Sequence, residues 1–321
     1  MKNFIKISIC AVILIIAGFA IFAKKPNGVV KRKLILINQF VEHPALNETV
    51  RGIIDALADA GFSQEETADI RVESAQANAA LAAQISNRFA NQLPDVVVCV
   101  GTVSAQSMCK YANSGQCKVV FSSITDPVGA GLVEDLSAPR GNITGVSNFV
   151  PLEPQLELMR KIQPSMKKLG IIYNFGEANS VSIVEKLDAI VAQFGLALVK
   201  QGVAKMADIS QAAVNLASRV DAIFISNDNT ALSCLPNIFR AGNAANIPVY
   251  VSDTDAVPMG ALAALGPNQY FIGRQTGEMV AKILGGANVS DLPVEFPNKM
   301  ELFVNFDAAE ILGIEVPEDV I

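Results

Sequence analysis

The sequence has few of the side chains on which most metal centres and catalytic triads depend. Its 321 residues include one histidine, His43, no tryptophan and five scattered cysteines. A histidine-rich zinc site, a Ser-His-Asp triad and a Cys-His dyad all need imidazoles or paired thiols that this chain supplies poorly. The composition therefore argues against most metal and nucleophile chemistry, and we expect no cofactor.

Basic residues are scarce as well. The chain has 25 lysines and arginines against 31 aspartates and glutamates, and four of the lysines lie in the first 25 residues, which hold no acid. The remainder therefore carries a net charge of −10. Phosphate contacts need clustered lysine and arginine, so no nucleic-acid partner is expected. With 51% apolar and 17% charged residues, the chain can bury a large core, and its length is typical of about two domains.

The amino terminus has the pattern of an export signal. Lys2 and Lys6 precede an almost wholly apolar run without charged residues, Ile7–Ala23, which ends at two further lysines. A basic start followed by such a run is typical of a secretory signal, although its length also suits an uncleaved anchor or, less simply, a buried helix. We expect a signal peptide or an N-terminal membrane anchor plus spacer over residues 1–31. The rest of the chain is then extracytoplasmic, in the periplasm or at the outer face of the cytoplasmic membrane.

An oxidising compartment changes the interpretation of the cysteines. Cys109 and Cys117 flank a polar stretch and are candidates for a small structural disulfide loop. Cys99 lies in an apolar run and Cys234 in an expected helix, so both are interpreted as buried thiols.

Short apolar runs alternate with amphipathic helices along the rest of the chain. A first series begins with the run Leu34–Ile37 and a second follows a break near Gly145–Leu152, where two prolines interrupt the pattern. Regular alternation of this kind indicates parallel sheets with right-handed crossovers. We therefore predict an α/β protein made of two doubly wound parallel-sheet lobes with a ligand cleft between them.

The ends of the expected strands are consistently small and polar. Ligands of open parallel sheets bind beyond the carboxyl ends of the strands, whereas polar loops and helix caps are the plainer explanation for such residues. Caps alone do not explain the acids at two neighbouring ends, Asp228-Asn229 and Asp253-Thr254-Asp255. Two lobes that face each other across these ends form a cleft suited to a small polar ligand.

Individual residues suggest how the charged groups of such a ligand would be held. The turn Gly101–Ser104 opens a helix whose backbone N–H groups attract a carboxylate, with hydroxyls from Thr102 and Ser104, unless Ser104 only caps the helix. Asp228 and Asp253 are candidates to pair with an ammonium group, and a glycosidase-like carboxylate pair is the alternative. The turn after Thr125-Asp126 lacks the third glycine of a dinucleotide fingerprint and indicates a cleft edge instead.

Several segments, taken in order, resemble one family. They are Val41–Leu46, Thr125–Val133, Tyr173–Ser180, Asp228–Thr230, Gly260–Ala263, Ile272–Gly277 and Asn305–Gly313. They are similar to ABC-transporter substrate-binding proteins of the tryptophan/tyrosine-binding type, which resemble type I periplasmic binding proteins. The resemblance extends from about Leu34 to the end of the chain.

The resemblance implies a set of ligand-binding residues. Added to Ser104, they are Glu42, Thr102, Thr125, Asp126, Asn174, Glu177, Asn179, Ser180, Asp228, Asn229 and Asp253. Within that set, Asn179 or Ser180 also suits the start of a helix. The chain departs from the family pattern at Asn47, Phe175 and Ser226-Asn227, and the last two departures fall at the expected cleft.

Type I lobes are joined by three crossings, which implies a chain that returns. The first lobe is then expected over residues 32–148 and 267–292, and the second over 149–266 and 293–321. Ligand capture would proceed by hinge closure of the two lobes.

The resulting expectation is a non-enzymatic, monomeric solute-binding protein of an ABC importer. It would capture a free amino acid, with an aromatic, tryptophan-like ligand favoured, and present it to an ABC permease with its ATPase. Two alternatives stay open: a sensory module of a receptor, and an amino-acid-processing enzyme such as a racemase or lyase on the same fold.

Overall fold

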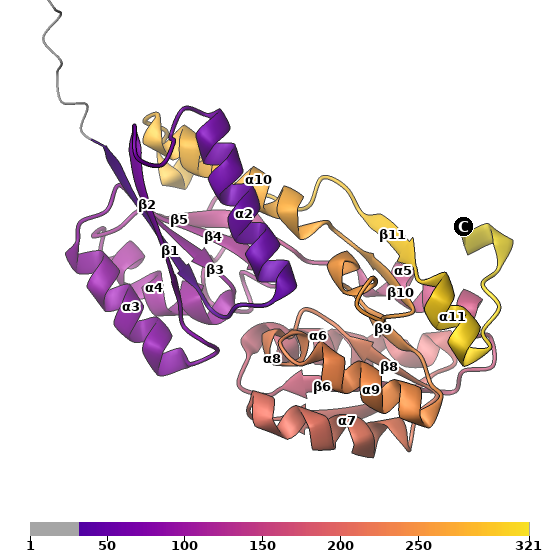
Figure 1. Ribbon diagram of the computed structural model, residues 1–321. Coiled ribbons are helices and arrows are strands. Elements are labelled where there is room, and N and C mark those ends of the chain that lie inside the picture. The colour runs from indigo at the N-terminus through magenta and orange to yellow at the C-terminus, as the bar shows by residue number, and fades with distance from the viewer. Residues whose placement is uncertain (1–31, 321) are drawn as a thin grey trace, which may run out of the picture. The chain divides into compact units, whose positions relative to one another are not determined.

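The computed structural model describes residues 32–320, so the expected export segment at 1–31 lies outside the described residues. Residues from Lys33 onward form two lobes, each built on its own sheet (Figure 1). The first sheet is parallel throughout, in the order β2-β1-β3-β4-β5. Its strands are β1 (Lys33–Gln39), β2 (Ala68–Ser74), β3 (Val96–Val100), β4 (Val119–Ile124) and β5 (Ile143–Ser147), and its helices are α2 (Pro44–Asp59), α3 (Ala79–Asn91) and α4 (Thr102–Asn113).

The second sheet repeats this order and adds one edge strand. It runs β11-β10-β9-β8-β6-β7, with only β11 antiparallel to its neighbour. The strands are β6 (Lys168–Asn174), β7 (Ala197–Val203), β8 (Ala222–Ile225), β9 (Val249–Val251), β10 (Ala263–Gly266) and β11 (Glu301–Val304). The helices are α5 (Leu152–Ile162), α6 (Ala178–Ile190), α7 (Ile209–Ala217), α8 (Asn229–Leu232), α9 (Leu235–Ala245), α10 (Gln269–Leu284) and α11 (Phe306–Leu312). Short 3-10 segments lie at Val191–Phe194, Met206–Asp208, Thr254–Ala256 (η3), Val289–Asp291 and Glu318–Val320. The predicted fold class, two doubly wound parallel-sheet lobes, is confirmed.

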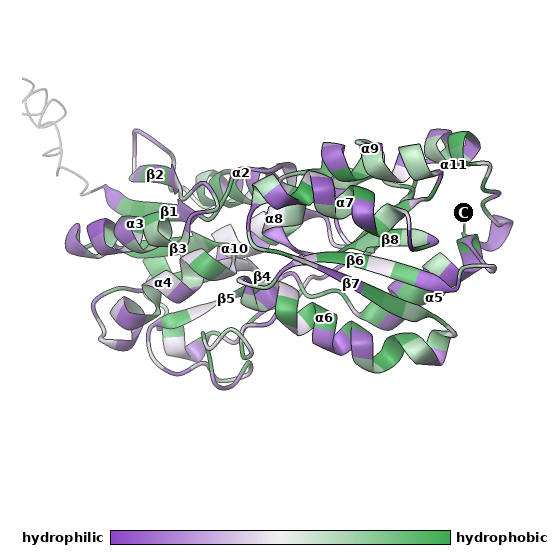
Figure 2. Cartoon of the chain, turned by 90° about the horizontal axis from the view of Figure 1, so that it is seen from below, coloured by the Kyte–Doolittle hydropathy of each residue, from purple (hydrophilic) through white to green (hydrophobic). Residues whose placement is uncertain are grey.

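The cores explain why these segments became strands and helices. All five residues of β3 and all six of β4 are buried, because helices cover both faces of the sheet. The helices are amphipathic, and α6 and α7 alternate hydrophobic and hydrophilic bands along their length (Figure 2). In α7 the buried side is Ile209, Ala212, Ala213 and Leu216, at the spacing of one helical face.

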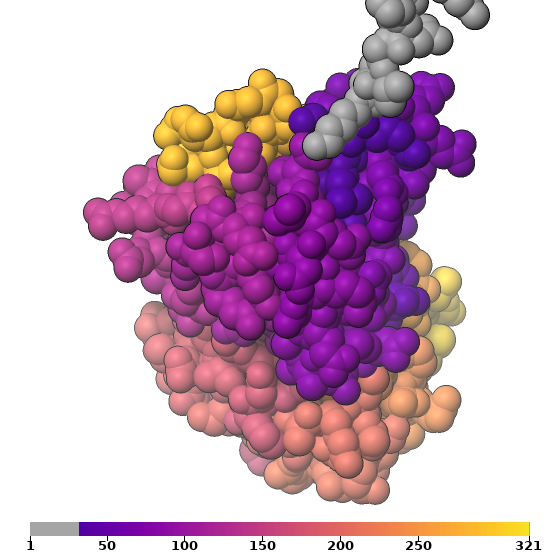
Figure 3. Space-filling view, turned by 90° about the vertical axis from the view of Figure 1, so that its left-hand side faces the viewer, coloured from indigo at the N-terminus to yellow at the C-terminus, as the bar shows by residue number. Residues whose placement is uncertain are grey.

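The chain crosses back to the first lobe after β10. Helix α10 packs along α2, and the late segment lies against the first lobe in the space-filling view (Figure 3). Glycines allow this contact: a Cβ on Gly273 would lie 2.1 Å from the Thr49 carbonyl oxygen, and one on Gly52 would lie 2.1 Å from the Tyr270 carbonyl oxygen. Beyond α10, Val289 and Val294 still belong to the first core, and the chain then crosses again to form β11.

None of the helices in the described part of the chain is long and apolar enough to cross a membrane.

Candidate functional site

The carboxyl ends of the two sheets meet at a buried polar boundary between the lobes. There the Nε2 atom of His43, just before α2, lies 3.4 Å from Oδ1 of Asn229, the first residue of α8. Gly101 precedes α4 at φ +93°, and a Cβ there would lie 3.1 Å from Cβ of Phe40 and 4.0 Å from Oδ1 of Asn229. Glycine is therefore required for both conformation and close approach at this point.

Four buried polar atoms at this boundary have no hydrogen-bond partner among the described residues. They are Nδ1 of His43, Oδ1 of Asn179, Oγ1 of Thr254 and Oδ2 of Asp255. His43 directly precedes α2, which lies close to η3 with Thr254 and Asp255, and Asn179 lies on α6, which is close to α4 of the first lobe. Buried polar groups are normally paired, and leaving one unpaired costs about 1–3 kcal/mol. Such a group of unpaired atoms indicates a place for a polar ligand.

Glu177 organises the second-lobe side of the boundary. Its Oε1 accepts hydrogen bonds from the Thr230 amide at 3.1 Å and hydroxyl at 2.7 Å. Its Oε2 accepts from the Asn229 amide at 3.2 Å and side-chain Nδ2 at 2.7 Å. The carboxylate therefore binds the N-terminus of α8 and fixes the orientation of the Asn229 side chain.

Asp228 is the N-cap of the same short helix. Its Oδ1 accepts from the Ala231 amide at 2.7 Å and its Oδ2 from the Asn174 amide at 2.5 Å. Burial, and secondly the nearby charge of Glu177, raise the pKa of Asp228 to about 7. Both oxygens are thus bonded to backbone, which gives Asp228 a clear role in holding the loop.

Asp253 and Asp255 form a second acidic pair. Burial, and secondly Asp255, raise the pKa of Asp253 to about 7, and its carboxylate accepts only a 3.3 Å bond from the Asp255 amide among the described residues. Burial, and then the charge of Glu48 on α2, raise the pKa of Asp255. Within the described residues neither carboxylate forms an ion pair with a lysine or arginine, so a cation between the lobes would be stabilised here.

The start of α4 supplies donors opposite these acceptors. Thr102 is its first residue and is 1% exposed, and amides of a first helical turn have no partner within the helix. Ser104 is directed elsewhere, because its hydroxyl donates to Oδ1 of Asn38 at 3.1 Å, within the first lobe. Asn38 in turn donates to Ser86 on α3.

Asp126 joins the two lobes instead of standing free. Its Oδ2 accepts from the Ser182 hydroxyl at 2.7 Å and from Lys186 Nζ at 2.5 Å, both on α6. Its Oδ1 accepts from the Gly129 amide, which holds the predicted turn. Neighbouring Thr125 donates to Oδ1 of Asn148 at 3.3 Å.

The other expected site residues lie in different surroundings. Glu42 is exposed and lines an open cavity of about 560 Å³ on the first lobe, next to Gln39. Asn174 bonds within the second lobe, donating to Thr230 at 2.8 Å. Asn179 donates to the Asn227 carbonyl at 2.8 Å, which leaves its own oxygen unpaired, and Ser180 is buried beside it.

The expected disulfide is not formed, because Cys109 and Cys117 are both free thiols. Cys109 lies on α4 and Cys117 leads into β4, and both lie near Cys99. Burial raises the pKa of all three thiols, so they stay protonated and weakly reactive.

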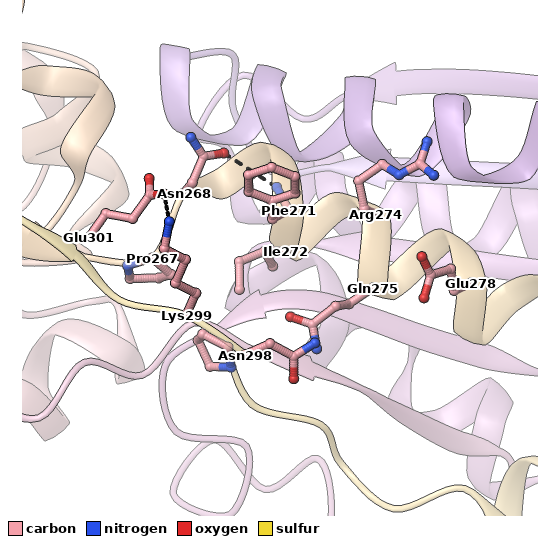
Figure 4. Close-up of a pocket in the computed structure, with 11 residues that line it drawn as sticks. Pro267, Asn268, Phe271, Ile272, Arg274, Gln275, Glu278, Asn298, Lys299 and Glu301 are labelled. Atoms are coloured by element: carbon pink, nitrogen blue, oxygen red, sulfur yellow. Dashed lines mark hydrogen bonds and ion pairs between the residues drawn. The ribbon is translucent and has the colours of Figure 1, made fainter. Parts of the chain in front are cut away.

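A further cavity, of about 380 Å³, lies at the crossing between the lobes (Figure 4). It is bounded by the start of α10, with Phe271 and Gln275, and by the segment before β11. Its lysine, Lys299, is paired with Glu301 at 2.9 Å. Pro267 and Asn268, directly after β10, also line this cavity, but none of the four unpaired buried atoms belongs to its lining residues, so the boundary described above is the stronger candidate site.

Sequence reasoning missed three of the four unpaired groups: His43, Thr254 and Asp255. A signal for each was present, since His43 stands in one of the motifs that carried the resemblance and the other two follow Asp253 in the acidic cluster. Which of these atoms would be left unpaired depends on side-chain directions across two lobes, and the sequence pattern does not contain that information.

Comparison with known proteins is consistent with this arrangement. A tyrosine-binding protein from Clostridioides difficile is 31% identical over 285 residues, which cover 89% of this chain and 82% of that protein. A Streptococcus pneumoniae structure, an ABC domain in complex with L-Trp, is 33% identical, covers 90% of this chain and 97% of its own, and superposes with a TM-score of 0.86.

A ligand-free, open substrate-binding protein from Clostridium difficile, described as having adhesive properties, is 34% identical. It covers 89% of this chain and 97% of its own, with a TM-score of 0.68. The model of the family described as ABC transporter substrate binding protein matches residues 34–321. Because that match spans both lobes and the boundary between them, the chain belongs to the ABC transporter substrate-binding protein family.

Proposed function

We propose that the protein captures a free aromatic amino acid between its two lobes and delivers it to the permease of an ABC importer. The observation that carries this proposal is the group of buried polar atoms left without partners at the lobe boundary: His43 Nδ1, Asn179 Oδ1, Thr254 Oγ1 and Asp255 Oδ2. All four are able to accept a hydrogen bond, and one of them belongs to the acidic pair Asp253–Asp255, which forms no ion pair with a lysine or arginine among the described residues. A ligand with several N–H donors and a positive charge satisfies them.

The ammonium group of an amino acid fits the second-lobe side. Asn179 Oδ1 is an unpaired neutral acceptor, Asp253 is a buried acid and Asp255 a half-buried one, and both acids have raised pKa values. A desolvated ammonium gains most from such partners, because charge-assisted hydrogen bonds are about twice as strong as neutral ones. Asp228 contributes indirectly, through the loop that it caps.

The carboxylate group fits the first-lobe side. The N-terminus of α4 presents free amides and the buried Thr102 hydroxyl, and the close approach allowed by Gly101 brings this helix end to the boundary. Helix N-termini favour anions through both their unpaired amides and their dipole.

Capture would involve closure of the lobes. The His43–Asn229 and Asp126–Lys186 contacts both join the first lobe to the second, so both must break when the lobes separate. The higher TM-score to the L-Trp complex than to the ligand-free, open relative supports a closed arrangement here. Closure about crossing segments is the usual motion of two-lobed binding proteins.

Relatives support the choice of ligand and setting. One is named a tyrosine-binding protein and another was solved with L-Trp, both at or above 31% identity. The basic and apolar start of the chain supports export, which places the lobes outside the cytoplasm beside a permease with its ATPase. A monomer suffices for this role, since each chain carries both lobes.

The proposal is tested by calorimetry and thermal shift on residues 32–321 with the twenty amino acids. We expect an aromatic amino acid to bind, and at 100 times its Kd to stabilise the protein by about 2.7 kcal/mol. The matched controls are the N-acetyl and the carboxamide forms of the same amino acid, which each remove one charge and should bind at least tenfold more weakly. Tight binding of a blocked form, or of no amino acid at all, would contradict the proposal.

A further inference from the structure

His43 is the only histidine of the chain, and it stands at the lobe boundary. It is 4% exposed, it precedes the first turn of α2, and its ring does not cap that helix. One ring nitrogen, Nε2, faces Asn229 of the second lobe, whereas the other, Nδ1, is buried without a partner among the described residues.

The hydrogen bonds around Asn229 determine which nitrogen carries the proton. Both oxygens of Glu177 accept from backbone amides, those of Asn229 and Thr230, so the carboxylate acts as an acceptor. The Asn229 atom that lies 2.7 Å from Glu177 must therefore be the NH2 nitrogen, a donor. The amide oxygen is then the atom turned toward His43.

This oxygen can only accept, so His43 must donate to it from Nε2. In a neutral imidazole with the proton on Nε2, Nδ1 carries a lone pair and is an acceptor. Burial lowers the pKa of His43 to about 4, so the ring is neutral at physiological pH. The unpaired atom at the boundary is thus an acceptor that needs a donor.

The neutral acceptor on His43 suits a different group of the ligand from the one that the carboxylates bind. Ammonium groups are bound best by charged acceptors, and Asp253 and Asp255 provide those on the second lobe. His43 belongs to the first lobe and has no charge, which suits a neutral N–H or O–H. Tryptophan and tyrosine, named for two relatives, each carry such a donor on the ring, and phenylalanine does not.

We propose that His43 is a specificity-determining residue, whose Nδ1 accepts a hydrogen bond from the ring N–H or O–H of the bound amino acid. This rests on the proposed function. Closure of the lobes fixes Nδ1 as the acceptor, because the Glu177–Asn229–His43 chain of hydrogen bonds, which holds the proton on Nε2, is complete only when the lobes meet. A ring without a donor leaves the buried nitrogen unpaired and binds more weakly.

The test compares ligands that differ only in the ring donor. They are tryptophan with its benzothienyl analogue, in which sulfur replaces the indole N–H, and tyrosine with phenylalanine. The wild-type protein should prefer the donor-bearing member of at least one pair by about tenfold or more. His43→Leu should reduce that preference to within about twofold, chiefly by weakening the donor-bearing ligand. His43→Asn, which keeps an acceptor near the position of Nδ1, should restore part of it.

A second measurement does not depend on any variant. With histidine labelled by ¹⁵N and no affinity tag, the protein gives one pair of imidazole nitrogen resonances. We expect Nδ1 in the unprotonated range, and it should move toward the protonated range on addition of the donor-bearing ligand but not of its matched analogue.

The outcomes separate the two proposals. If the wild-type protein binds no amino acid, the proposed function fails and this inference fails with it. If it binds amino acids but His43→Leu weakens all of them equally, or if Nδ1 proves to be the protonated nitrogen, only the role of His43 is overturned.

Discussion

The salt bridge between the lobes offers a quantitative prediction. Asp126 of the first lobe accepts hydrogen bonds from Lys186 and Ser182 of α6 in the second lobe, and the Lys186 ammonium also lies 5.8 Å from the Phe149 ring. If closure accompanies ligand binding, every contact of this kind contributes to affinity. Replacing Lys186 by Met removes the charge and keeps most of the aliphatic chain.

The size of the effect follows from exposure. The Lys186 and Asp126 side chains are 43% and 23% exposed, so the pair is screened by water and is worth about 0.5–1 kcal/mol. The Ser182 hydroxyl still satisfies the carboxylate in the variant. We therefore expect Lys186→Met to raise the Kd for the bound amino acid by about two- to fivefold, and the effect should shrink at high salt.

A matched variant separates closure from general electrostatics. Lys200 pairs with Asp188 at 3.0 Å, and both residues belong to the second lobe; the lysine is as exposed as Lys186, at 42%, and the aspartate is more exposed than Asp126, at 52%. Lys200→Met should leave the Kd unchanged. Calorimetry of both variants, with stopped-flow release rates, makes the comparison. Equal Kd values for Lys186→Met and Lys200→Met would refute the reasoning.

Two further predictions concern packing and pH. Gly273→Ala should destabilise the protein by about 1–3 kcal/mol in urea unfolding, because its Cβ meets the Thr49 carbonyl at 2.1 Å, whereas Gly285→Ala, with its nearest neighbour at 3.4 Å, should be neutral. The raised pKa of Asp253 means that the ligand-free folded state binds more protons than the unfolded chain between pH 3.8 and about 7, so the stability contributed by this group falls as pH rises through that window. Because the ligand's ammonium group favours ionised Asp253, the affinity of the wild-type protein should rise about tenfold from pH 6 to pH 8. The variant Asp253→Asn should bind weakly and show no such rise. If the variant keeps the pH profile of the wild-type protein, Asp253 does not belong to the site.

Most of the fold could be predicted from the sequence because its signal is local. Apolar runs such as β3 are buried on both faces, and amphipathic helices such as α7 show their period directly. Errors came where the signal was short: Cys234, which was expected within a helix, lies between two helices, α8 and α9. Strand β11 has only four residues, none fully buried, and so lacks a buried-strand pattern.

The site was harder to predict because polar residues at strand ends have several possible partners. Ser104 and Asn174 were expected at the ligand, yet each bonds to its own lobe. Asp126 was expected at the ligand and instead pairs with Lys186, sixty residues later in the sequence. These choices depend on how the two lobes meet, which no local pattern encodes, and they are also the reason that His43 was overlooked.

The most direct test of ligand capture uses the absence of tryptophan from the protein. At an excitation wavelength selective for indole the protein itself has almost no fluorescence, so any change in emission on mixing comes from the added tryptophan. The account predicts a saturable shift in tryptophan emission that is reversed by tyrosine or another competing amino acid and is lost when the amine is acetylated. Unchanged emission of tryptophan, together with no thermal shift from any aromatic amino acid, would contradict the claim that the buried boundary between the lobes is an aromatic amino-acid site.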